Sequence, residues 1–129
     1  MKYYQSKRIS GISFEEAKEK VIAALQTEGF GVLTEIDIQA TMKKKLDKDY
    51  LPHTILGACN PVFADKVLQI EPTISTMLPC NVTLRKLDNN DIEVATIDPS
   101  SAMTAVGNDA ILPIASEVQQ KLKNVLDAL

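Results

Sequence analysis

The stretch TILGACNP at positions 54–61 constrains the fold more than any other part of the chain. Residues 54–59 are apolar on both alternating faces, which is typical of a strand buried on both sides. Asn60 then carries the side-chain acceptor preferred at a helix N-cap, and Pro61 has the fixed φ that the first helical position tolerates. The sequence therefore predicts a buried strand that ends at Cys59, immediately before a helix.

A second Cys-Asn pair follows in the run LPCNV at positions 78–82. Cys80 alternates with Val82 and Leu84, which predicts that it lies on the core face of a strand, whereas Asn81 faces the other way. We expect the two Cys-Asn pairs to lie near each other. Burial is the common fate of a free thiol, so a packing role is favoured for both cysteines over a reactive one.

The rest of the chain alternates between strand and helix patterns. Further strands are predicted over residues 2–9, 31–38, 80–87 and 91–97, the last two joined as a hairpin by a polar turn. Helices are predicted over 13–29, 39–48, 61–70 and 72–78, and a terminal helix begins near 111 with Asn108 or Asp109 at its cap. The segment 102–107, around Met103, is an unusually apolar loop. It should cover a groove, a core edge or a partner chain.

This order predicts an α+β fold, a two-layer sandwich in a single domain over residues 1–129. The element order is β-α-β4-α with short inserted helices, and the sheet is mainly antiparallel with the two long helices on one face. The other sheet face must be covered by the short helices, by the apolar loop or by another subunit. A homodimer meets that need most simply.

Composition excludes several classes of protein. The chain has 129 residues, of which 45% are hydrophobic and 24% charged, and this is ordinary globular usage. A net charge of -3 argues against a nucleic-acid partner, and no apolar run approaches the length of a membrane span. The first seven residues contain no apolar signal core, so we expect a cytoplasmic protein. Its two cysteines would then stay reduced.

Three other charged or metal-ligating features give weak signals. In the strand predicted over 31–38, Val32, Thr34, Ile36 and Ile38 share one face, and Glu35 and Asp37 share the other. No third oxygen ligand is visible near the two carboxylates, so solvation is favoured over a cation site. Three lysines at 43–45 lack arginine or aromatic neighbours, and a solvated face is favoured over an anion site. His53 would lie about 20 Å from Cys59 along one strand at ~3.3 Å per residue. With no CxxC motif, a zinc site is not indicated.

Four runs together resemble the domain of unknown function 302 family of prokaryotic proteins: GFGVLTEIDI at 29–38, ILGACNP at 55–61, LPCNV at 78–82 and IDP at 97–99. The resemblance implies a fold similar to one repeat of the TATA-binding protein, and a homodimer. It does not imply DNA binding, because the acidic balance lacks a basic face. The family offers no catalytic residues to transfer, but it draws attention to Cys59, Asn60, Pro61, Cys80 and Asn81.

Two functional hypotheses follow. In the favoured one, the chain is a binding or sensing module that holds a small ligand or a soft metal ion such as copper(I). Its candidate ligand-binding residues are Cys59, Asn60, Cys80, Asn81 and Met103, and no cofactor is assigned. In the alternative, Cys59 is the nucleophile of a thiol-dependent redox or sulfur-handling protein and Cys80 resolves the intermediate. No hydrolytic residue set is present.

Overall fold

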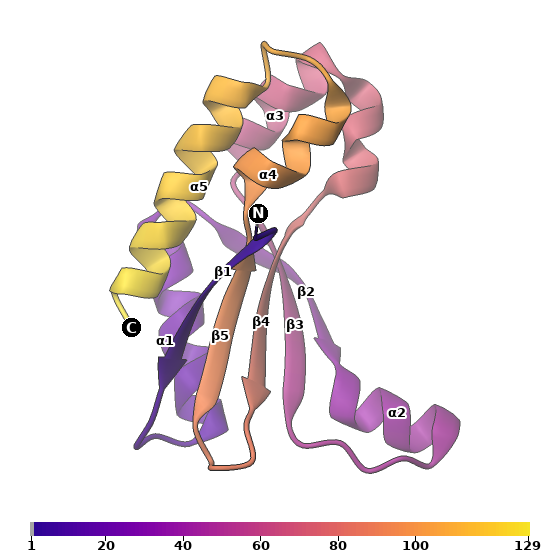
Figure 1. Cartoon of the computed structure of the whole chain (residues 1–129), viewed down its shortest axis with the longest axis vertical. Coiled ribbons are helices and arrows are strands. Elements are labelled where there is room, and N and C mark those ends of the chain that lie inside the picture. The colour runs from indigo at the N-terminus through magenta and orange to yellow at the C-terminus, as the bar shows by residue number, and fades with distance from the viewer. Residues whose placement is uncertain (1) are drawn as a thin grey trace.

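The computed structural model describes residues 2–129 as one five-stranded sheet with helices around it (Figure 1). All neighbouring strands are antiparallel, and their order across the sheet is β1-β5-β4-β3-β2. The strands are β1 (Tyr4–Ile9), β2 (Gly31–Asp37), β3 (His53–Cys59), β4 (Cys80–Lys86) and β5 (Ile92–Ile97). β3 lies inside the sheet, between β4 and β2, and its Thr54, Leu56 and Ala58 are buried on one face. On the other face His53, Ile55 and Cys59 are only half-buried, so the prediction of a strand buried on both sides is met on one face alone.

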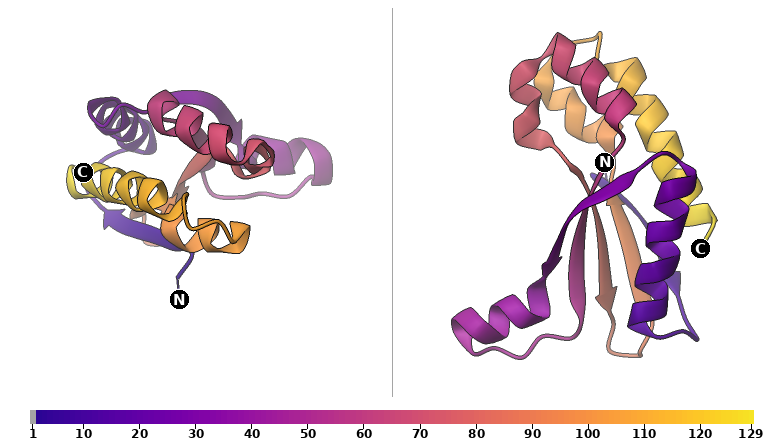
Figure 2. Two further views of the ribbon diagram at one scale, coloured as in Figure 1. Left: turned by 90° about the horizontal axis from the view of Figure 1, so that it is seen from above. Right: turned by 180° about the vertical axis from the view of Figure 1, so that it is seen from behind.

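The two long helices, α1 and α5, pack together over one face of the sheet. α1 lies behind the strands in Figure 1 and in front of them in the right-hand view of Figure 2, with α5 beside it. The predicted α+β two-layer architecture is therefore confirmed. The helices are α1 (Phe14–Thr27), α2 (Ile38–Leu46), α3 (Pro61–Ile70), η1 (Pro72–Met77), α4 (Pro99–Met103), η2 (Thr104–Val106) and α5 (Leu112–Asp127). Within residues 2–129, no helix is both long and apolar enough to cross a membrane.

The apolar interior has two parts. The larger cluster fills the space between the sheet and the two long helices, where Leu25 of α1, Leu56 of β3 and Leu122 of α5 are fully buried. The smaller cluster lies beyond one end of the sheet, where α3, η1 and α4 gather around the start of α5; it contains Val67, Ile74, Met103, Ile111 and Ala115. α5 belongs to both, so it joins the two parts.

A β-bulge at Leu33 changes the predicted faces of β2. Strict alternation placed Val32, Thr34 and Ile36 on one face, but the register with β3 shifts between Val32 and Thr34. Val32 keeps its place opposite buried Ala58, whereas Ile36 pairs with Ile55 on the opposite face and is 45% exposed. The prediction for this strand is wrong, because a bulge inserts one residue and inverts every side chain beyond it.

Helix boundaries also differ from the sequence predictions. Ser13 caps α1, accepting a hydrogen bond from the Glu16 backbone N–H at 3.1 Å. The segment 102–107, predicted as a loop, is instead helical as far as Val106 and is divided between α4 and η2. α5 begins at Leu112 without a side-chain cap, and Asn108 instead accepts from the backbone N–H of Ala110 at 3.0 Å. Asn108 therefore stabilises a turn before the helix.

The second face of the sheet is open. Figure 1 views the molecule from this side, and no helix lies in front of β3 and β4. The short helices lie beyond one end of the sheet, apart from α2 at the β2 edge, so of the three expected covers of this face the short helices are excluded. Met77 and Ala102 reach the margin of the open face from the helical end.

Candidate functional site

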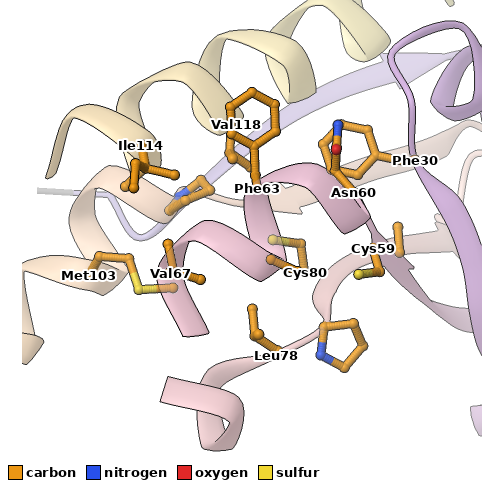
Figure 3. Close-up of a pocket in the computed structure, with 15 residues that line it drawn as sticks. Phe30, Cys59, Asn60, Phe63, Val67, Leu78, Cys80, Met103, Ile114 and Val118 are labelled. Atoms are coloured by element: carbon orange, nitrogen blue, oxygen red, sulfur yellow. The ribbon is translucent and has the colours of Figure 1, made fainter. Parts of the chain in front are cut away.

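A small apolar cavity lies where the two hydrophobic clusters meet, between the ends of β3 and β4 and the helices α3, α4 and α5 (Figure 3). Its volume is about 40 Å³. A cavity needs roughly 10–15 Å³ to hold one water molecule, so this one accommodates only a few atoms. Its walls are Phe30, Ala58, Cys59, Asn60, Phe63, Ala64, Val67, Leu78, Pro79, Cys80, Pro99, Met103, Ile114, Ala115 and Val118.

Neighbouring strand ends bring the two cysteines to this cavity. Cys80 is the first residue of β4 and its neighbour in the sheet is Ala58, so it lies on the helix-covered face. Cys59 is the last residue of β3, one position beyond Ala58. The expectation that the two Cys-Asn pairs lie near each other is met for the thiols, since Cys59 acts electrostatically on Cys80.

Burial raises the pKa of the Cys80 thiol from its usual 9.0 to about 11, and the nearby Cys59 adds to the rise. An apolar surrounding penalises the thiolate because it cannot solvate the charge. Near pH 7 only about one Cys80 in 10,000 is ionised, since each pH unit below the pKa reduces the thiolate tenfold. Cys80 is therefore a protonated, weakly nucleophilic thiol in the absence of a bound cation.

Asn60 occupies the predicted N-cap position of α3, with Pro61 at the first helical position, but its side chain makes no capping bond. Its Nδ2 instead donates to the carbonyl oxygen of Glu28, at 3.1 Å. The prediction that Asn60 caps the helix with its side chain is wrong in this respect. A Cβ on Gly29 would come within 3.1 Å of the same nitrogen, and Gly29 has a φ of +84°. Glycine thus leaves room for Asn60 to reach the end of α1.

Of the candidate ligand-binding residues, Met103 lines the cavity and Asn81 does not. Met103 ends α4, is only 6% exposed and extends toward Val67 in the cavity wall (Figure 3). Asn81 alternates with Cys80 and is exposed on the open face of the sheet. The structure therefore brings Cys59, Cys80 and Met103 to one cavity, together with Asn60, and places Asn81 elsewhere.

Sequence reasoning missed the apolar residues that enclose the thiols. Phe63 and Val67 lie one turn apart on α3 and face the cavity, whereas Phe30 follows α1 and Val118 belongs to α5. The spacing of four between Phe63 and Val67 marked an apolar helix face, and that signal was available. Nothing local indicated that Phe30 or Val118 would meet that face.

The other candidate groups do not form a site. Among the described residues, no three His, Cys, Asp or Glu side chains come together as a metal-binding group. Glu35 pairs with Lys18 at 3.4 Å, and Asp37 caps α2 by accepting from the Ala40 N–H at 2.9 Å. Lys43 pairs with two aspartates in solvent, which fits the expected solvated face.

Comparison with known proteins places this architecture in a family. Residues 5–129 match the sequence profile described as "Domain of unknown function DUF302". The chain belongs to the DUF302 family. A crystal structure of an uncharacterized conserved DUF302 protein from Bacillus stearothermophilus has the same fold, with a TM-score of 0.91 at 24% sequence identity. The similarity covers 98% of this chain and 97% of that one. Among curated proteins, none matches this DUF302 chain.

Proposed function

We propose that this DUF302 protein is a small binding module that holds a soft metal ion such as copper(I) in the cavity between β3, β4 and α4. One observation carries the proposal. Two thiols and a thioether, those of Cys59, Cys80 and Met103, belong to the walls of a single apolar cavity of atomic dimensions. Thiolate and thioether sulfur are the ligands that select copper(I) over harder cations.

Cys80 carries a proton on its sulfur that a bound metal ion would replace. A thiol must lose its proton to ligate a metal, so metal binding releases protons and strengthens as the pH rises. Because the pKa of Cys80 is about 11, copper(I) must displace a proton that buffer at pH 7 does not remove. The apparent affinity should therefore increase steeply with pH.

The same observation disfavours the thiol-enzyme alternative. A resolving cysteine must attack as a thiolate, and burial keeps Cys80 protonated. The size of the cavity favours an ion over an organic ligand, because drug-sized ligands occupy about 300–1,000 Å³. A protein with free thiols at its centre is also suited to a reducing compartment such as the cytoplasm.

The proposal is tested by titrating the reduced protein with copper(I) in competition with a colorimetric chelator. We expect one ion per chain and a loss of affinity of roughly 100-fold in Cys80→Ala, since a thiolate ligand is removed. Met103→Leu should lose roughly tenfold, because leucine keeps the volume and removes only the sulfur. Met77→Leu is the matched control, since Met77 lies outside the cavity. Equal affinities in all four proteins would refute the proposal.

We also propose that the protein acts as a homodimer through the segment 33–51, which we call the arm. It carries five exposed large apolar side chains: Leu33, Ile36, Leu46, Tyr50 and Leu51. α2, at its centre, has no buried residue and projects from the body (Figure 1). Exposed apolar groups carried by one projecting segment favour its association with another surface.

Sedimentation equilibrium tests this assembly. We expect twice the chain mass of 14.2 kDa for the wild type and a monomer for Leu46→Lys. Val62→Lys is the control, because Val62 is similarly exposed, at 63%, but lies on α3 outside the arm. A monomeric wild type would exclude the homodimer and leave the metal site unaffected.

A further inference from the structure

The open face of the sheet contains a groove of about 630 Å³, separate from the thiol cavity. This volume lies within the range of about 300–1,000 Å³ found for small-molecule sites. Small side chains, among them Thr83 and Ala95, form its floor, while larger ones, among them Tyr4, Met77 and Arg85, form its margin. Because the floor residues are short and the margin residues long, the sheet itself creates the hollow.

The floor carries hydrogen-bonding groups without protein partners. Asn81 and Thr83 alternate along β4 on the open face, where Thr83 lies beside Ala95 of β5. Within residues 2–129, neither side chain makes a hydrogen bond to another protein group. Two polar groups beside apolar Ala95 and Pro79 resemble the arrangement that fixes the orientation of a bound molecule.

One end of the groove is lined by Arg85 and Glu93, and Arg8, outside the lining, adds a further positive charge beside them. Arg85 binds Glu93 in a two-point ion pair, Nε to Oε1 at 2.8 Å and Nη2 to Oε2 at 3.3 Å. Arg8 lies directly across the sheet from Glu93 on its other side, so a single carboxylate lies between two arginine positions. His53, beside Arg85, adds no further positive charge near pH 7, because burial and Arg85 lower its pKa below 6.5 and leave it neutral.

Arginine has five donors, and the pair with Glu93 uses two of them. The Arg85 side chain is 48% exposed, so its remaining donors face the groove and solvent. A carboxylate can accept charge-assisted hydrogen bonds from the remaining N–H donors of the guanidinium. The charged end of the groove is therefore complementary to an organic anion.

The opposite end is apolar and aromatic. The rings of Tyr3 and Tyr4 meet edge to face with centroids 5.0 Å apart, and Met77 and Ile97 complete this end. Tyr3 is 68% exposed and Met77 is 38% exposed, although both are large apolar side chains. From Asn81 to Arg85 the floor extends about 13 Å at ~3.3 Å per residue.

We propose that this groove binds a small organic anion with a flat apolar body about 10 Å long and one carboxylate. The carboxylate contacts Arg85, and the body lies over Thr83 and Ala95 toward the tyrosines. This site is distinct from the thiol cavity and does not depend on the metal proposal.

Biphenyl-4-carboxylate and its neutral analogue biphenyl-4-methanol test the site by NMR titration of the ¹⁵N-labelled full chain. We expect shifts in the amides of residues 81–85 and 93–97, and roughly tenfold tighter binding of the carboxylate. Arg85→Gln should remove that tenfold preference, whereas Lys20→Gln, the same charge change at an exposed position of α1, should preserve it. Ala95→Phe should fill the floor and weaken binding of both probes.

Three results would overturn the proposal. The first is a set of shifts confined to the thiol cavity or the arm. The second is equal binding of the two probes with no effect of Arg85→Gln. The third is an absence of amide shifts together with evidence that a second copy of the chain occupies the groove. That evidence would be a dimer in sedimentation of the wild type and a monomer for Ala95→Glu. Copper(I) binding is measured in its own titration of the cavity variants, so the two sites stand or fall separately.

Discussion

The side chain of Asn60 joins the start of α3 to the end of α1, because its Nδ2 donates to the carbonyl oxygen of Glu28 at 3.1 Å across 32 residues of sequence. Asn60 is 8% exposed. This bond fixes the α1–β2 turn against the strand end that carries Cys59. Asn60 therefore helps to position the cavity wall through a long-range contact, although its sequence context predicts only a local N-cap.

Replacement of Asn60 by Asp distinguishes a role as the N-cap of α3 from a role as hydrogen-bond donor to Glu28. Aspartate is as good an N-cap as asparagine, so a capping role would leave stability unchanged. Because Asn60 donates, Asn60→Asp should place a carboxylate oxygen against the Glu28 carbonyl and lower the free energy of unfolding by about 2–3 kcal/mol. Asn108→Asp is the control, because Asn108 uses its amide oxygen as an acceptor and should tolerate the change. Urea denaturation measures both.

Gly57 should be intolerant of even a methyl group. A Cβ at this position would lie 2.8 Å from Cγ of Pro79 and would also meet the Thr34 hydroxyl. Gly57→Ala should therefore lower the free energy of unfolding by about 1–3 kcal/mol through overpacking. Gly31→Ala on the neighbouring strand has open space around its Cβ and should cost far less. Equal destabilisation in thermal melts would show that the crowding at Gly57 is not responsible.

The raised pKa of Cys80 should appear in the pH dependence of stability. The unfolded thiol ionises near 9.0 and the folded one near 11, so the unfolded state gains a negative charge first. The contribution of Cys80 to the free energy of unfolding is fully present below pH 9. It should fall by about 2–3 kcal/mol as the pH rises to 11, because a pKa difference of one unit corresponds to about 1.4 kcal/mol. The difference between wild type and Cys80→Ala isolates this group. A constant difference over that range would contradict the assignment.

Asp37 should matter more than Glu35, although the two looked equivalent as a carboxylate pair. Asp37 caps α2, whereas Glu35 makes an exposed ion pair with Lys18. Asp37→Ala should cost about 1 kcal/mol in the stability of α2, and Glu35→Ala less than about 0.5 kcal/mol. Hydrogen exchange of residues 40–46 measures this locally. Faster exchange in Glu35→Ala than in Asp37→Ala would reverse the ranking.

The fold was predictable because its signals are local and repeated. Apolar alternation defined β3 and β4, and spacings of three and four residues defined α1 and α5. The bulge at Leu33 was not predictable in this way, since the β2 sequence alternates without interruption and only pairing with β3 shows where the register shifts. The sequence pattern therefore identified the strand and misassigned its faces.

The candidate site was predictable only in part, for a related reason. Cys59 and Cys80 were associated through their similar settings, but the cavity also needs Phe30, Val67 and Val118 from three other segments. Such contacts depend on how helices pack on the sheet, which no local pattern encodes. Asn81 was grouped with the cysteines because it adjoins one of them, whereas strand alternation sends it to the other face.

Native mass spectrometry of the reduced protein with one equivalent of copper(I) tests the central proposal most directly. It reports both the number of ions per chain and the number of protons displaced. We expect one copper per chain with the loss of two protons, one from each thiol, and no stable adduct in the Cys59→Ala, Cys80→Ala double variant. Copper bound without proton loss, or bound equally well by the double variant, would contradict a thiolate site in this cavity.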